Sequence, residues 1–158
     1  MRLKELCQLR GVSGDEKEVH DFLYKEYEKR NLSIIKDRLG SVFGLKKGKD
    51  SSYKIMISSN IDESGGMISD IREDGLMEFL TIGLYEKSLF EQRIVKVLNR
   101  RHEEYTGFII KNEKELLLDA GYGSKEEVLE AGIQIGDMFV LDIPTLCLPN
   151  EEILSKNL

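Results

Sequence analysis

The sequence predicts an α/β fold joined to a small β-barrel, and three observations support this prediction. Residues 1–60 hold two patterns of helical period followed by three short apolar runs. Residues 67–142 hold five or six short strands with one small helix, which is typical of a compact barrel. Apolar residues make up 41% of the 158 residues, with no low-complexity run, so a packed core is expected.

The first part of the chain is expected to form two helices and a strand pair. Residues 1–10 have apolar side chains at helical spacing. Ser13 with Glu16 three positions later predicts a capping box, which would open a helix running to about residue 30. Residues 33–36 and 41–46 then read as strands around a turn at residues 37–40.

Residues 53–58 are expected to be the central buried strand, because three apolar residues follow one another at 55–57. The run ends in Asn60, Asp62 and Glu63, followed by a glycine pair. In open α/β sheets ligands bind where such strands end, so these side chains are site candidates. The alternative interpretation is a polar strand end whose acidic residues cap turns.

The second part is expected to be made of short strands at 67–71, 76–81, 93–98, 106–110, 115–119 and 138–142. Ser124 and Glu127 form a second capping box, which predicts a helix that Gly132 ends. Residues 119–123 are glycine-rich but lack the lysine and spacing of a phosphate-binding P-loop. The apolar residues Leu84, Tyr85, Leu89 and Phe90 are expected in the core, or else on a partner surface. A further helix could begin at residue 151.

Composition excludes several function classes. The net charge of −6, with acidic and basic residues interspersed, disfavours nucleic acid as a partner. No apolar stretch is long enough to span a membrane, and the charged N-terminus does not resemble a signal peptide, so a cytoplasmic location is expected. Cys7 and Cys147 are expected to be free, buried thiols. His20 and His102 are expected to have structural or surface roles.

An ordered set of segments resembles the N-terminal half of the dinuclear-zinc aminopeptidases that form tetrahedral assemblies. That family includes glutamyl and deblocking aminopeptidases, and some members are labelled cellulase- or endoglucanase-like. The matching segments lie in order along nearly the whole chain, at residues 3–7, 11–14, 37–40, 60–65, 82–83, 119–121, 124–127 and 132–137.

The resemblance implies a partial aminopeptidase-type α/β domain at residues 1–66, a β-barrel assembly or dimerisation domain at 67–142, and a return segment at 143–158. It also implies that intact relatives bind two zinc ions. Asn60 stands at the family's histidine-ligand position, and an amide is a poor zinc ligand, so metal binding there is doubtful. Asp62 matches the family's catalytic-site aspartate and is expected to be vestigial.

We therefore expect a truncated aminopeptidase-like protein that is inactive and needs no cofactor alone, because most metal ligands and the general base of the family would follow Leu158. A separate chain carrying the catalytic half is one expected partner. The alternative is a stand-alone oligomerisation module that retains a relic site. A homo-oligomer is expected, because association with a second copy would cover the apolar faces of residues 1–60.

Overall fold

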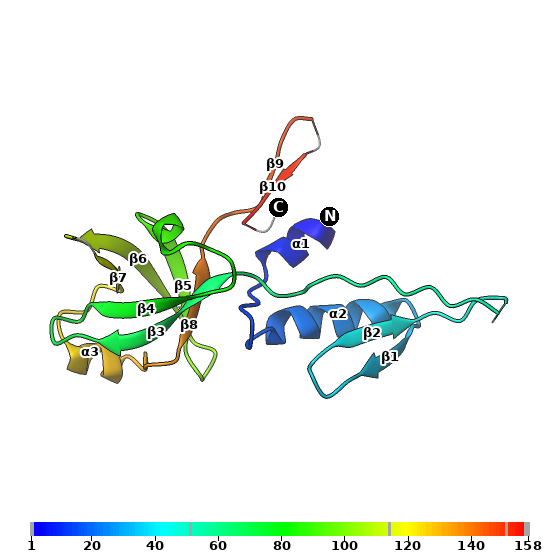
Figure 1. Ribbon diagram of the computed structural model, residues 1–158, viewed down its shortest axis with the longest axis horizontal. Helices are drawn as coiled ribbons and strands as arrows, with labels where there is room; N and C mark the ends of the chain where they lie inside the picture. Colours follow the sequence, from blue (N-terminus) through cyan, green and yellow to red (C-terminus); the bar gives the residue numbers. More distant parts are fainter. Residues whose placement is uncertain (1, 51, 114, 151, 157–158) are drawn as a thin grey trace.

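The computed structural model describes residues 2–50, 52–113, 115–150 and 152–156. It contains a helical and hairpin part formed by the first 45 residues, an extended connection, and a closed six-stranded barrel. Figure 1 shows the two parts lying at opposite ends of the long axis, joined by the extended connection. The predicted combination of an α/β part with a small barrel is confirmed.

The barrel consists of six antiparallel strands in the order β3-β4-β7-β6-β5-β8. Pairing of Gly66 with Phe139 and of Met67 with Met138 joins the first strand to the last and closes the barrel. Closure removes exposed strand edges, so this part can be stable without a neighbour. The strands are β3 (Gly65–Ile71), β4 (Met77–Ile82), β5 (Ile94–Leu98), β6 (Glu104–Asn112), β7 (Glu115–Asp119) and β8 (Met138–Leu141).

Three phenylalanines form the centre of the barrel core. Phe79, Phe90 and Phe139 are almost fully buried and meet edge to face, with ring centroids 5.1–5.9 Å apart. Phe90 comes from the short 3₁₀ helix η1 (Lys87–Phe90). The loop before η1 is only partly buried in the core. Tyr85 packs against the cluster, but Leu84 is 98% exposed.

The glycine pair at the start of β3 is required by this packing. A Cβ on Gly66 would lie 2.2 Å from Cζ of Phe139, and a Cβ on Gly65 would lie 2.4 Å from the Phe139 carbonyl oxygen. Both contacts are too short for any side chain. These two glycines therefore allow the chain to enter the barrel directly after Glu63 and Ser64.

The small helix on the barrel follows its predicted signals. α3 (Lys125–Glu130) begins after Ser124, whose side-chain oxygen accepts a hydrogen bond from the Glu127 amide. Gly132 has a φ of +96° and ends the helix. The helix contributes Val128 to the barrel core.

The N-terminal part consists of α1 (Arg2–Gln8), α2 (Lys17–Lys29) and a hairpin of β1 (Ser33–Lys36) with β2 (Val42–Leu45). Both predicted strands are confirmed. The capping box predicted at Ser13 is wrong, because α2 begins after Glu16 without a side-chain cap. The Ser13 hydroxyl is instead used in a contact with Asp62, described below.

Residues 53–58 differ most from their predicted environment. They pair with no strand in the part of the chain that the structure describes, and Ile55 and Ile57 are 91% and 92% exposed. The prediction of a buried strand is therefore wrong for this structure. A strand needs neighbours on its edges and apolar cover on its faces, whereas the β1–β2 hairpin forms a separate two-stranded sheet.

The C-terminal segment is a small hairpin outside the barrel (Figure 1). β9 (Leu146–Cys147) pairs with β10 (Ile153–Leu154), so the helix suggested from residue 151 is wrong, although residue 151 itself lies outside the described ranges. Cys7 and Cys147 are both free, as predicted, but only Cys7 is buried. Among the described residues, no helix is long and apolar enough to cross a membrane.

Candidate active-site edge

The predicted site residues lie where the extended connection reaches the barrel. Asn60 and Asp62 are exposed, whereas Glu63 is buried. Glu63 forms an isolated parallel bridge with Val12, in the loop between α1 and α2. The structure therefore brings one stretch of this loop beside the end of the extended connection, and Asp62 and Glu63 each contact it.

Asp62 makes a long-range contact. Its Oδ2 accepts a hydrogen bond from the Ser13 hydroxyl at 2.6 Å, across 49 positions of sequence. A carboxylate that caps its own turn would bond to an amide two or three residues away. The observed contact instead holds the carboxylate against a second segment and leaves it exposed to solvent.

Glu63 connects three segments. Its amide donates to the Gly11 carbonyl oxygen at 2.6 Å, and its Oε1 accepts from the Gly11 amide at 3.1 Å. The same Oε1 accepts from Nζ of Lys156 at 2.8 Å, and both side chains of this ion pair are only 5% exposed. Sequence reasoning missed Lys156, because no local pattern links two residues 93 positions apart.

The histidines do not join this edge. His20 lies on α2 and contacts the Tyr24 ring edge to face, and His102 is exposed in a turn with a φ of +61°. Within the described ranges, no three histidine, cysteine or acidic side chains gather in a way that could hold a metal ion. An amide at Asn60 and a carboxylate at Asp62 do not satisfy the donor set of a zinc site.

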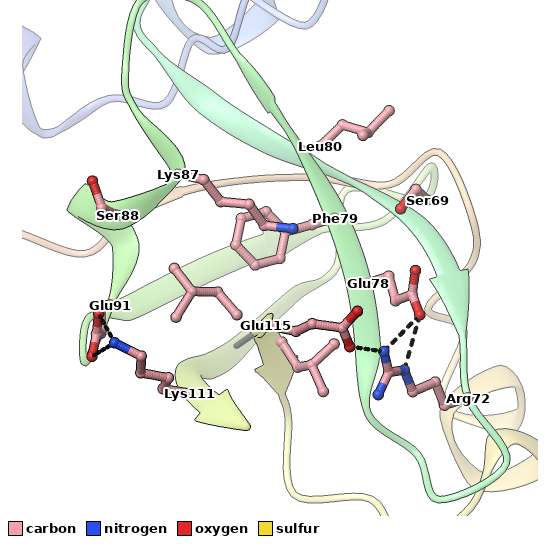
Figure 2. A pocket seen from close by; sticks show the side chains of 12 residues that line it. Ser69, Arg72, Glu78, Phe79, Leu80, Lys87, Ser88, Glu91, Lys111 and Glu115 are labelled. Atoms are coloured by element: carbon pink, nitrogen blue, oxygen red, sulfur yellow. Dashed lines mark hydrogen bonds and ion pairs between the residues drawn. The ribbon is translucent and has the colours of Figure 1, made fainter. Parts of the chain in front are cut away.

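A cavity lies elsewhere, on the barrel wall (Figure 2). It has a volume of about 450 Å³ and opens where β4 and β7 diverge, since the described residues of these two strands pair only at Met77 and Leu118. Phe79 is one of the residues that line it, with Nζ of Lys87 4.3 Å from the ring centroid. None of residues 60–63 lines this cavity.

The charges around this cavity are mostly paired with one another. Figure 2 shows the Arg72 guanidinium between Glu78 and Glu115, and Lys111 beside Glu91. The nitrogen–oxygen distances from Arg72 are 2.8 Å to Glu78 and 2.6 Å to Glu115. The hydrogen bonds to Glu115 and Glu78 raise the pKa of Arg72 above its usual value. This arrangement ties the diverging strands together, which is a structural role.

Comparison with known proteins identifies the family. A model described as M42 glutamyl aminopeptidase matches residues 40–158, well over half of the chain. The chain belongs to this family. It is 30% identical over 172 residues to the putative aminopeptidase FrvX of Escherichia coli K12, and the alignment covers 99% of this chain and 48% of FrvX. This M42 chain thus spans about half the length of the curated relatives it matches.

Solved structures support the same assignment. Aminopeptidase APDkam598 from the archaeon Desulfurococcus kamchatkensis is 35% identical, with a TM-score of 0.85 over 92% of this chain and 44% of that protein. PhTET1-12s, described as a dodecamer, is 25% identical, with a TM-score of 0.79 over 93% of this chain and 46% of its own. The resemblance noted from the sequence is confirmed at the level of family and fold.

Proposed function

We propose that this M42 chain supplies one edge of an aminopeptidase site and that these 158 residues do not hydrolyse peptides alone. The observation that carries the proposal is the extended segment 53–58. It leads into Asn60 and Asp62 and lacks strand neighbours within the described ranges. The chain matches about half the length of each relative. This supports the proposal that the other half of the M42 fold would complete the sheet and the site.

The exposed apolar residues indicate how the second half would bind. Ile55, Met56 and Ile57 follow one another and are all more than three-quarters exposed, so both faces of the segment lack cover. Consecutive apolar residues are typical of a strand that is buried on both faces in a sheet. The proposed partner is therefore a polypeptide with the remaining half of the M42 fold, which adds strands to the edges of this segment and covers its faces.

Zinc enters this proposal only with the second half. In the complete assembly a metal ion would polarise the peptide carbonyl or activate a water molecule. Within this chain, Asp62 would support the site through the position that Ser13 gives it. Asn60 contributes at most a neutral amide oxygen, which weakens any metal bound at that position relative to a histidine.

The experiment combines this chain with the C-terminal half of an M42 aminopeptidase and measures cleavage of aminoacyl-anilides and zinc content. The expected result is a complex in which Asn60→His binds more zinc than the natural chain. Asn60→Gln is the matched control and should bind no more. Chelator-sensitive cleavage by the isolated chain would overturn the proposal, as would the failure of the two halves to associate.

The barrel supports a second function, that of a stand-alone oligomerisation module with a relic site. Its closed sheet and buried core need no partner for stability, and one similar structure is described as a dodecamer. This function predicts a defined homo-oligomer by light scattering, with a size that chelators do not change. A monomer at high protein concentration would contradict it.

A further inference from the structure

The buried pair of Glu63 and Lys156 has no simple explanation in stability. Both side chains are 5% exposed, and their charges meet at 2.8 Å. Removing two charges from water costs about as much as their attraction returns, so an apolar pair would stabilise the fold at least as well. What an ion pair adds is geometric specificity, because the charged hydrogen bond forms only when the two groups are correctly placed and oriented.

The glutamate side of the pair is fixed by the backbone. Glu63 exchanges two hydrogen bonds with Gly11, one through its amide and one through its carboxylate. The carboxylate that receives Lys156 is therefore held in place by the loop that also supplies Ser13 to Asp62. Glu63 directly follows Asp62, so the lysine docks one residue away from the proposed site.

The lysine side is fixed at a second point. The Lys156 carbonyl oxygen accepts a hydrogen bond from the Tyr85 hydroxyl at 2.9 Å. One residue earlier, the hydroxyls of Ser155 and Thr145 form a buried hydrogen bond of 3.0 Å at the base of the β9–β10 hairpin. Residue 156 is thus attached to the site edge by its side chain and to the loop before η1 by its backbone.

We propose that Glu63 and Lys156 are a positioning pair, which returns the C-terminal hairpin to the site edge and holds Glu63, and with it the neighbouring Asp62, against the loop at residues 11–13. The two residues act through Asp62 rather than on a substrate. The role in assembling an active site rests on the proposed function. The anchoring of the hairpin does not depend on it and can be tested separately.

Hydrogen exchange on the isolated chain tests the anchoring. Lys156→Met and Glu63→Gln should each lower the protection of residues 145–156 by about tenfold or more, while the barrel strands keep theirs. Lys17→Met, which removes an exposed pair with Asp21, is the matched control and should leave the hairpin unchanged. Unchanged protection of residues 145–156 in both single variants would overturn the proposal.

The double variant Glu63→Gln/Lys156→Met covers the case in which a single variant does not fold. It leaves no buried charge without a partner, so it should fold while the hairpin still loses protection. A folded double variant with full protection in residues 145–156 would show that the pair does not anchor the hairpin.

Kinetics of the complex of the two halves test the positioning. Glu63→Gln should lower kcat by about tenfold or more with little change in KM, and Lys156→Arg should retain most of the activity because it keeps the charge. A loss of hairpin protection without any change in kcat would overturn the positioning role. A complex that is inactive with natural residues would instead overturn the proposed function, and hydrogen exchange would still decide the anchoring.

Discussion

The barrel and the extended segment 53–58 carry similar apolar residues in opposite environments. Phe79, Val97 and Phe139 are almost fully buried in a closed sheet, whereas Ile55 and Ile57 are almost fully exposed. The barrel strands find their partners within about 75 positions of one chain, and together they form a closed barrel. The comparison shows that one part of this M42 chain is complete as a packed unit and that the other has an apolar surface without cover.

The largest expected effect comes from truncating one large apolar side chain to alanine in each region and comparing the two losses of stability. Phe139→Ala should destabilise the protein by about 3–5 kcal/mol, because it removes a ring that contacts Phe79 and Phe90. Ile57→Ala should change the free energy of unfolding by no more than about 0.5 kcal/mol, since the side chain is 92% exposed. Urea titrations of both variants measure the difference, and equal losses would contradict the comparison.

A smaller effect is expected where the two regions join. Gly66→Ala should cost about 1–3 kcal/mol, because the new Cβ would lie 2.2 Å from the Phe139 ring and force it to move. Gly123→Ala is the matched control, since its Cβ would have nothing closer than 3.6 Å. Thermal unfolding measures the stability of the two variants against the natural chain. A Gly66→Ala variant as stable as the natural chain would refute the close packing of Gly66 against the Phe139 ring.

The smallest effect concerns the ion pairs that link the N-terminal part to the barrel. Glu104 on β6 pairs with Lys96 and with Arg10, and these contacts lower its pKa, the hydrogen bond from Lys96 most of all. A lowered pKa adds stability above the unfolded value of about 4.3, and this stability is lost as the pH falls through the folded value. Because the side chain is 42% exposed, the contribution should be below about 1 kcal/mol.

Unfolding curves of the natural chain and Glu104→Gln, recorded from neutral to acidic pH, test this link. The two stabilities should differ near pH 7 and converge below about pH 4. Glu130→Gln, which replaces an exposed carboxylate on α3, is the matched control and should be as stable as the natural chain at pH 7. A gap for Glu104→Gln that persists at low pH would mean that its charge is not the cause.

Much of the barrel could be predicted from sequence because its signals are local. The sequence pattern placed β5 and β7 to within one residue, and the Ser124 cap and Gly132 stop placed α3. The surroundings of residues 53–58 could not be predicted, since burial of a strand depends on neighbours distant in sequence. Motif order makes Asn60 and Asp62 site candidates. The Ser13–Asp62 and Glu63–Lys156 contacts, in contrast, join residues 49 and 93 positions apart and leave no local pattern.

Native-state hydrogen exchange of the isolated chain tests most directly whether the extended segment is incomplete alone. Residues 53–58 should exchange at nearly the rate of an unfolded peptide at concentrations where the chain is monomeric, while the core residues of β3–β8 should be protected to the limit of global unfolding. Protection of residues 53–58 equal to that of the barrel strands, in a chain shown by sedimentation to be monomeric, would contradict the account.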